Sequence, residues 1–240
     1  MLKRLKSHVR FAGQSDEQIL EATRQDCLAG AYYLVDHRGQ PGYQPGENVV
    51  HIFSMGALAT EALEASDQLL SEGIYANVIQ VSSNDLLTGL LAEENNYRHL
   101  KEGLGITGDL FVQAEEVPAV SASNGKASYP PKYFAPNKLS QNSQAASAQL
   151  QTLGARRVPI VSVHDGEPGL LDNIGSAIGC RQKTLAVKKH SKSGRPVDIY
   201  SYHSIAAADV AEGARQALRD GLEDRVYIPR TTAQSLGLSL

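Results

Sequence analysis

The stretch N-V-V-H-I-F-S-M-G-A-L-A-T-E-A-L-E-A-S-D-Q-L-L-S-E-G-I-Y-A-N-V-I-Q-V-S-S, residues 48 to 83, decides the fold. Residues 48–54 are β-branched and apolar, which is typical of a strand buried on both faces. The segment that follows repeats apolar residues at helical spacing and ends at Gly73, as in an amphipathic helix with a glycine C-cap. Residues 74–83 form a second strand-like run. This order predicts a βαβ unit with parallel strands and a right-handed crossover.

The same alternation of strands and helices recurs later in the chain. It predicts strands at 157–163 and 184–189, and helices at 170–179 and 206–220. Near the amino terminus, Ser15 and Gln18 have the spacing of a capping box, which predicts a further helix over residues 15–29 before Gly30. The fold class is therefore α/β: a doubly wound, mostly parallel (mixed) sheet with helices on both faces.

Composition narrows the class of protein. The 240 residues carry 23 Lys and Arg against 26 Asp and Glu, a formal net charge of −3, so nothing favours binding to nucleic acid or a membrane surface. No apolar run approaches the roughly 20 residues that span a bilayer, and the amino terminus is charged where a signal peptide is apolar. We expect a soluble, cytoplasmic protein whose two distant cysteines, Cys27 and Cys180, are reduced structural thiols.

Loops at the carboxyl ends of parallel strands share one edge of the sheet, where ligands usually bind. The ligand-edge candidates are Gly56 after the first strand, His164 and Asp165 after the third, and His190 after the fourth. A helix amino terminus beside Gly56 offers N–H groups to an anion, but glycine there also suits a simple turn. Neither G-x-G-x-x-G nor a P-loop motif follows a strand, so no phosphate fingerprint decides between these interpretations.

The triplet H-D-G at residues 164 to 166 resembles a general base beside an orienting acid. Adjacent side chains on an extended chain point to opposite faces, so His164 and Asp165 need not meet. No G-x-S-x-G or H-E-x-x-H motif supplies a nucleophile or metal ligands, and Asp109 with Glu115 and Glu116 does not indicate a paired-carboxylate site. The sequence therefore predicts no catalytic residue, no metal site and no cofactor-binding residue in this chain.

Three stretches resemble a known family: V-V-H-I-F-S-M-G-A-L-A-T-E-A-L-E-A-S-D-Q-L-L-S-E-G-I-Y-A-N-V-I-Q-V-S-S-N-D-L-L, V-P-I-V-S-V-H-D-G-E-P-G-L-L-D-N-I-G, and K-S-G-R-P-V-D-I-Y-S-Y-H-S-I-A-A-A-D-V. They are similar to the carboxy-terminal domain of transketolase-like thiamine diphosphate enzymes, and most of all to the homodimeric type of pyruvate dehydrogenase decarboxylating component. D-C-L-A-G-A-Y-Y-L-V-D, residues 26–36, is similar to the segment joining the middle domain to the last one. The resemblance implies that residues 1–36 end the middle domain. Residues 37–240 would then form the carboxy-terminal domain, with a long loop near 118–142.

In that family the carboxy-terminal domain is mainly structural. The resemblance implies a parent oxidoreductase that decarboxylates pyruvate and transfers the two-carbon unit to a lipoyl group. Thiamine diphosphate and Mg are held by the other domains, through a G-D-G motif that this sequence lacks. We therefore expect a piece of a larger enzyme, or a separate subunit, that is inactive alone, binds the other domains as partners and forms a homodimer. The alternatives are a piece of a transketolase or related thiamine enzyme, and a stand-alone regulatory anion-binding module.

The run K-S-G-R-P-V-D-I-Y-S-Y-H-S-I, residues 192–205, contains residue types of a catalytic loop. Gly194 permits an unusual backbone angle, Pro196 suits the first turn of a helix, and Arg195 is placed to pair with a nearby carboxylate. Its position before the last helix and its resemblance to the family favour a structural joint instead. Arg195→Ala is then expected to reduce stability or assembly before it affects any catalytic step.

Overall fold

The structure, a computed structural model, describes residues 1–106 and 158–226. The predicted long loop at 118–142, and the acidic residues Asp109, Glu115 and Glu116, lie outside these described residues.

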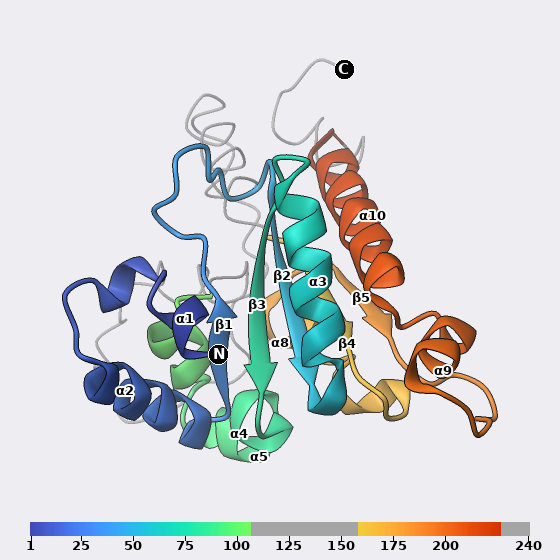
Figure 1. Cartoon of the computed structure of the whole chain (residues 1–240), viewed down its shortest axis with the longest axis horizontal. Coiled ribbons are helices and arrows are strands. Elements are labelled where there is room, and N and C mark those ends of the chain that lie inside the picture. The colour runs from blue at the N-terminus through green and yellow to red at the C-terminus, as the bar shows by residue number, and fades with distance from the viewer. Residues whose placement is uncertain (107–157, 227–240) are drawn as a thin grey trace, which may run out of the picture.

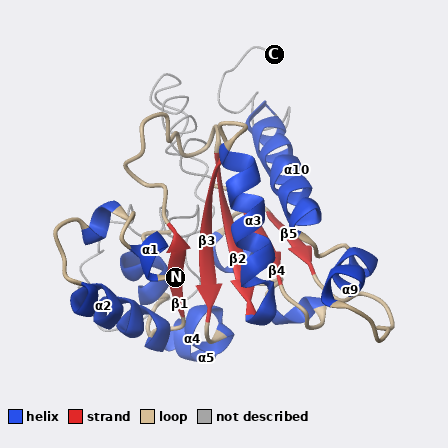
Figure 2. Cartoon of the chain, viewed as in Figure 1, coloured by secondary structure: helices blue, strands red, loops and turns tan. Residues whose placement is uncertain are grey.

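A five-stranded mixed sheet forms the centre of the molecule (Figures 1 and 2). The strand order is β1-β3-β2-β4-β5, with β1 antiparallel to β3 and all the other neighbouring pairs parallel. The strands are β1 (Ala31–Val35), β2 (Val49–Met55), β3 (Tyr75–Val81), β4 (Ile160–Val163) and β5 (Gln182–Leu185). The predicted α/β class with a mixed, mostly parallel sheet is confirmed.

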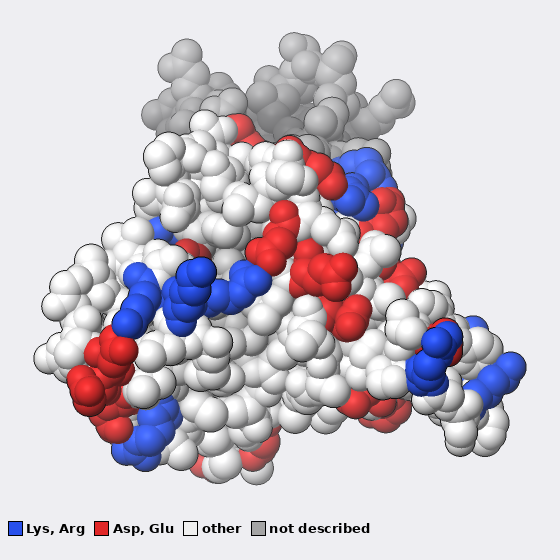
Figure 3. All heavy atoms as spheres, in the orientation of Figure 1, with Lys and Arg blue, Asp and Glu red and all other residues white. Residues whose placement is uncertain are grey.

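Helices cover both faces of this sheet. The helical elements are α1 (Leu2–Leu5), η1 (Val9–Phe11), α2 (Asp16–Leu28), η2 (Gly56–Leu58), α3 (Ala59–Leu70), α4 (Asn84–Thr88), α5 (Leu90–Glu94), the π-helix η3 (His99–Gly103), η5 (Pro168–Leu170), α8 (Ile174–Ile178), α9 (Pro196–His203) and α10 (Ala207–Val226). The long helices α3 and α10 pack on one face, and α4, η3 and α8 contribute to the core on the other (Figure 1). On the α3 and α10 side, basic and acidic side chains are interspersed without a broad area of one sign (Figure 3).

The alternation of strand side chains explains why both faces need a cover. Val50 and Ile52 of β2 lie in the core with α3 and α10, whereas Phe53 lies in the core on the opposite face. The two central strands pair in parallel register from Val49 with Tyr75 to Met55 with Val81. Because both faces of these strands are buried, their sequences are mostly apolar, and His51, Ser54 and Asn77 are buried polar exceptions.

The amino-terminal segment adds an edge to the sheet. The predicted capping box is present: the Ser15 hydroxyl accepts from the Gln18 backbone N–H at 3.3 Å, and the Gln18 side chain accepts from the Ser15 N–H at 2.9 Å. β1 follows α2 and is hydrogen-bonded to β3 in the same sheet as the later strands. The domain boundary that the sequence analysis places at residue 36 stays a prediction. β1 lies on the amino-terminal side of this boundary and pairs with β3 on the other side.

Two elements differ from the sequence prediction. β5 spans Gln182–Leu185 rather than 184–189, because the Gln182 amide donates to the Ser162 hydroxyl at 2.8 Å and so satisfies a polar residue inside the strand. The predicted helix at 170–179 is the shorter α8, preceded by the 3-10 turn η5, and it ends at Gly179 in the left-handed region (φ +76°). The thiols of Cys27 and Cys180 form no disulfide.

Candidate functional site

The structure brings two of the ligand-edge candidates together. Gly56 follows β2 directly and has φ +65°, a left-handed conformation that a residue with a side chain adopts at a cost. A Cβ atom at this position would lie 3.3 Å from Oδ1 of Asp165, which comes from the loop after β4. Gly56 and Asp165 are thus neighbours at this edge of the sheet, although they are more than 100 positions apart in the sequence.

His164 is fully buried and Asp165 is exposed, so the two adjacent side chains lie in different environments. Nδ1 of His164 accepts a hydrogen bond from the Gly166 N–H at 3.2 Å, and its backbone N–H donates to the Leu185 carbonyl at 3.2 Å. Burial lowers the pKa of His164 despite the nearby negative charge of Asp165. The imidazole is thus neutral with its proton on Nε2, which has no hydrogen-bond partner among the described residues, and its Nδ1 holds the H-D-G turn.

His190 and the predicted joint lie farther along the same edge. His190 is exposed, and within the described residues no hydrogen bond links it to the H-D-G turn. Arg195 caps α9 and forms a two-point ion pair with Asp198, from Nε to Oδ2 at 2.8 Å and from Nη2 to Oδ1 at 3.2 Å. Pro196 occupies the first turn of α9, as predicted. Gly194 does not use the backbone freedom that glycine permits, because its φ is not in the positive range.

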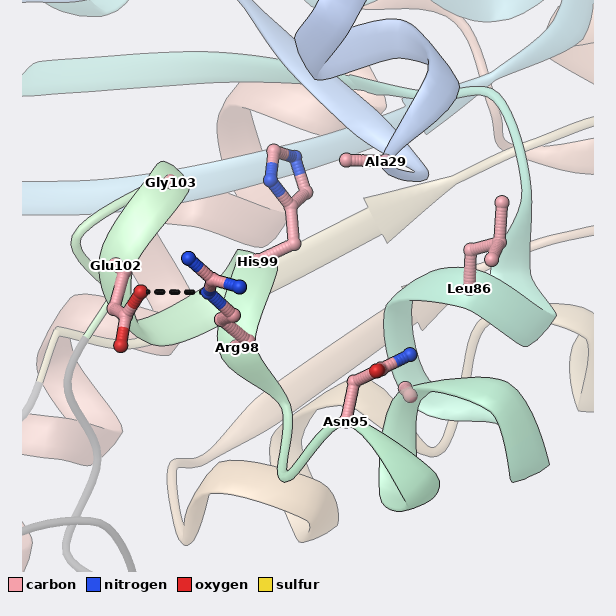
Figure 4. Close-up of a pocket in the computed structure, with 8 residues that line it drawn as sticks. Ala29, Leu86, Asn95, Arg98, His99, Glu102 and Gly103 are labelled. Carbon is pink, nitrogen blue, oxygen red and sulfur yellow. Dashed lines mark hydrogen bonds and ion pairs between the residues drawn. The ribbon is translucent and has the colours of Figure 1, made fainter.

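A larger cavity, of about 510 Å³, lies at the carboxyl end of β3 and was not predicted (Figure 4). Its lining comes from the end of α2, from α4 and α5, and from η3 with the residues just before it. The lining residues are Ala29, Leu86, Ala92, Asn95, Arg98, His99, Glu102 and Gly103. The volume falls within the roughly 300 to 1,000 Å³ of small-molecule sites.

The backbone beside this cavity is strained. Asn96 and Tyr97 are consecutive residues with φ of 53° and 52°, and the π-helix η3 follows them. Left-handed conformations of residues with side chains and single turns of π-helix both concentrate at functional sites. Asn tolerates this region better than most residues, so the pair Asn95-Asn96 is the one sequence signal of the irregular backbone.

Close packing fixes His99 on the wall of the cavity. Its Nε2 lies 2.6 Å from the Ala31 carbonyl oxygen, so Nε2 carries the proton and donates it. A Cβ atom on Gly103 would lie 2.3 Å from Nδ1 of His99, so any other residue at this position must displace the His99 ring. His99 is therefore a fixed part of the wall rather than a mobile acid or base.

The residues just beyond η3 tie this wall to the sheet. The Leu104 carbonyl accepts from the Tyr33 hydroxyl at 2.8 Å and from Nη1 of Arg38 at 3.0 Å. The Arg38 guanidinium also binds both carboxylate oxygens of Asp36, which is almost fully buried. Burial alone would raise the pKa of Asp36, but the hydrogen bonds and charge of Arg38 outweigh burial and lower it.

The polar groups of this cavity suit binding better than catalysis. The Arg98 guanidinium lies 2.9 Å from a Glu102 carboxylate oxygen, and both side chains are exposed (Figure 4). The Asn95 amide donates to the Leu91 carbonyl at 2.9 Å. Among the residues that line the cavity there is no serine or cysteine nucleophile for His99 to activate. In the part of the chain that the structure describes, no three His, Cys, Asp or Glu side chains are grouped to hold a metal ion.

Comparisons with known proteins add similarity at the level of solved structures. No family model matches the sequence, and no curated protein is significantly similar to it. Transketolase from Leishmania mexicana is 14% identical over 87% of this chain and 20% of its own, with a TM-score of 0.42. Transketolase from Campylobacter jejuni is 11% identical over 77% of this chain and 18% of its own (TM-score 0.39). A split-gene transketolase, described as an inactive beta4 tetramer, is 16% identical over 76% of this chain and 44% of its own (TM-score 0.37).

The chain spans about a fifth of the length of the single-chain transketolases that it matches. The TM-scores of these three structures are all below 0.5. Among the described residues, no helix combines the length and apolarity needed to cross a membrane.

Proposed function

We propose that this chain is the structural and assembly domain of a thiamine diphosphate-dependent enzyme, namely the carboxy-terminal domain of a 2-oxo-acid (pyruvate) dehydrogenase decarboxylating component. The observation that carries the proposal is the segment at residues 48–83. Its sequence resembles the family, and it folds as β2, η2, α3 and β3 in the element order that the family has. In this proposal thiamine diphosphate and Mg belong to partner domains, and the assembly is a cytoplasmic homodimer.

The sheet edge supports a role without catalysis. Gly56 makes a turn, His164 is neutral and holds the H-D-G loop, and the Arg195 ion pair closes the first turn of α9. None of these groups is arranged with a nucleophile. In this proposal they keep the strand ends in shape while partner domains supply the chemistry.

The proposal is tested by purifying the tagged chain from its own cells and assaying the complex for two thiamine-dependent reactions. Release of carbon dioxide from pyruvate supports the pyruvate dehydrogenase type, and two-carbon transfer from a ketose phosphate supports the transketolase alternative. The recombinant chain alone is expected to bind no thiamine diphosphate by calorimetry and to release no carbon dioxide. A native complex without any thiamine-dependent activity would overturn the proposal, as would turnover by the chain alone.

The cavity of about 510 Å³ favours a second candidate, a stand-alone ligand-binding regulatory module. A ligand that binds only the folded state raises the melting temperature, by an amount that grows with the logarithm of its concentration relative to its Kd. A thermal-shift screen of anionic metabolites, compared between the wild type and Arg98→Met, tests this candidate. Stabilisation that disappears in the variant would favour the regulatory module over the assembly domain.

A further inference from the structure

A second, smaller cavity lies at the carboxyl end of β5, between the loop that leaves this strand and the end of α9. It measures about 250 Å³ and is lined by Leu185, Ala186, Lys188, Lys189, His203 and Ser204. The loop and α9 protrude from one side of the sheet (Figure 1), and basic side chains lie over this protrusion (Figure 3). The cavity is separate from Gly56 and His164, the residues around which the sequence suggested anion binding.

His203 has a buried nitrogen without a partner in the wall of this cavity. The residue is 7% exposed, its Nε2 lies 3.1 Å from the Ser191 hydroxyl, and its Nδ1 has no hydrogen-bond partner among the described residues. When the serine hydroxyl donates to Nε2, the tautomer that results has its ring N–H at Nδ1. Buried polar groups are nearly always hydrogen-bonded, so in this tautomer Nδ1 lacks an acceptor, which a ligand that enters the cavity would supply.

The lysines around the cavity lack negative partners. Nζ of Lys188 donates to the Thr184 carbonyl at 3.0 Å, and Nζ of Lys189 lies 3.7 Å from the ring centre of Tyr202. Nζ of Lys192 lies 4.6 Å from the centre of the same ring. Within the described residues, no carboxylate lies within the 4.0 Å of an ion pair from any of the three ammonium groups. Arg195 in the same loop has its own partner in Asp198, so it does not share in this excess of positive charge.

Carboxylates on α10 set the limit of the positive region. Asp209 and Glu212 line an adjoining cavity that also reaches Lys188. The Asp209 carboxylate accepts from the Ala206 N–H at 3.1 Å, and Glu212 pairs with Arg215 and Arg219. A negative ligand is thus favoured on the side of Lys189 and His203, away from α10.

Ser204 contributes to the same wall. It ends α9 with φ 56° and ψ 49°, a left-handed conformation that is costly for a residue with a side chain. This conformation follows His203 directly and places Ser204 in the cavity lining beside it. Its hydroxyl is a further donor, because no hydrogen bond within the described residues engages it.

We propose that this cavity binds a phosphate group, held by the ammonium groups of Lys188 and Lys189 and by the Nδ1–H of His203. Phosphate oxygens accept several charge-assisted hydrogen bonds at once, and lysine is a common phosphate ligand. The volume is below the usual range for larger small-molecule ligands, so it suits inorganic phosphate or the head of a small phosphate monoester. The site does not depend on the proposed assembly function.

The test is calorimetric titration of the intact chain with inorganic phosphate and, separately, with glycerol phosphate, in a chloride buffer. The K188M/K189M double variant is expected to weaken binding by about tenfold or more, since about 1.4 kcal/mol corresponds to each factor of ten. Lys3→Met removes an exposed lysine of α1 and is the matched control, expected to bind like the wild type. Tighter binding of the phosphate salt identifies free phosphate as the ligand, and tighter binding of the ester identifies an organic phosphate.

His203→Gln tests the third ligand, and circular dichroism shows whether each variant keeps its fold. If His203→Gln does not fold, nuclear magnetic resonance of the wild-type histidines replaces it, and phosphate is expected to shift the His203 ring signals. Absence of binding to both probes would overturn the proposal. The proposal would also be overturned if Lys3→Met lost as much phosphate affinity as the double variant, or if the double variant kept the wild-type affinity. Phosphate-induced shifts confined to the ring signals of other histidines would overturn it as well.

Discussion

Replacing Arg38 with methionine is expected to loosen the wall of the larger cavity and to destabilise the protein. The guanidinium donates from Nε to Oδ1 of Asp36 at 2.8 Å, from Nη2 to Oδ2 at 2.6 Å, and from Nη1 to the Leu104 carbonyl at 3.0 Å. It also lies 4.4 Å above the ring centre of Tyr33. Methionine keeps most of the apolar stem and removes all the donors.

The size of the expected loss of stability follows from the Asp36 carboxylate, which the variant leaves without its guanidinium partner. The Asp36 side chain is 4% exposed, and without the guanidinium it keeps one hydrogen bond, from the Arg38 backbone N–H at 3.1 Å. Breaking a buried ion pair from one side costs about 3 to 5 kcal/mol. Because Arg38 itself is 36% exposed, we expect the lower end, about 3 kcal/mol. For a chain of this length that lowers the melting temperature by about 6 to 12 °C.

The loss of stability in Arg38→Met is expected to be larger at neutral pH than in acid. In the wild type the folded pKa of Asp36 is lowered, so the pair stabilises the fold above about pH 4 and this contribution is lost as the pH falls. In the variant, burial without Arg38 raises the pKa of Asp36 in the folded state. The buried carboxylate therefore destabilises the fold at neutral pH, and this destabilisation decreases when acid protonates it. The difference in the free energy of unfolding between wild type and variant therefore becomes smaller from pH 7 toward pH 4.

The measurement is urea unfolding followed by circular dichroism at pH 7 and at pH 4.5. Arg98→Met is the matched control, because its ion pair with Glu102 is exposed on both sides and is worth about 0 to 1 kcal/mol. Adding Asp36→Asn to Arg38→Met is expected to recover part of the loss. A loss below about 1 kcal/mol, or one that is equal at both pH values, would refute the assignment of Asp36 and Arg38 as a structural pair.

Three further outcomes are expected. Burial lowers the pKa of His51 from its ordinary 6.5 to about 4, which is worth about 3 kcal/mol, so unfolding becomes easier as the pH falls from 6.5 to 4. His51→Gln is expected to flatten this dependence in urea titrations, and an unchanged slope contradicts it. Gly56→Ala is expected to cost about 1 to 2 kcal/mol in thermal unfolding, whereas Gly213→Ala within α10 costs nothing, and equal effects refute the left-handed turn. Gly103→Ala displaces His99, so the ring signals of His99 shift in magnetic resonance spectra, and unshifted signals contradict the packing.

The central part of the fold could be predicted because its sequence signals are local. Residues 48–83 alternate between buried strand and amphipathic helix, and each change of pattern falls within a few residues of an observed boundary. β1 gave no comparable signal of its direction. Its five residues are apolar, but their antiparallel partner β3 begins about 40 residues later, and nothing in the intervening sequence reports which neighbour or direction is chosen.

The larger cavity could not be predicted because it depends on backbone angles rather than residue types. Asn96 tolerates a positive φ, but the same angle at Tyr97 has no sequence signature. Similarly, β5 begins two residues earlier than predicted because side chains from neighbouring elements satisfy Gln182. These include Ser162 of β4, to which its amide donates at 2.8 Å. A polar residue can be assigned to the inside of a strand only when its hydrogen-bond partners are known.

The edge of the sheet also shows why residue type alone misplaces function. His164 and Asp165 form the most suggestive motif of the sequence, yet the histidine is neutral and fully buried, with Nδ1 bound to the turn that it belongs to. At β5 the relation is reversed: Lys189 stands in an unremarkable loop, but its charge has an aromatic ring for a partner and no carboxylate among the described residues. Unbalanced charge, rather than a familiar motif, therefore directs the search for a ligand to the end of β5.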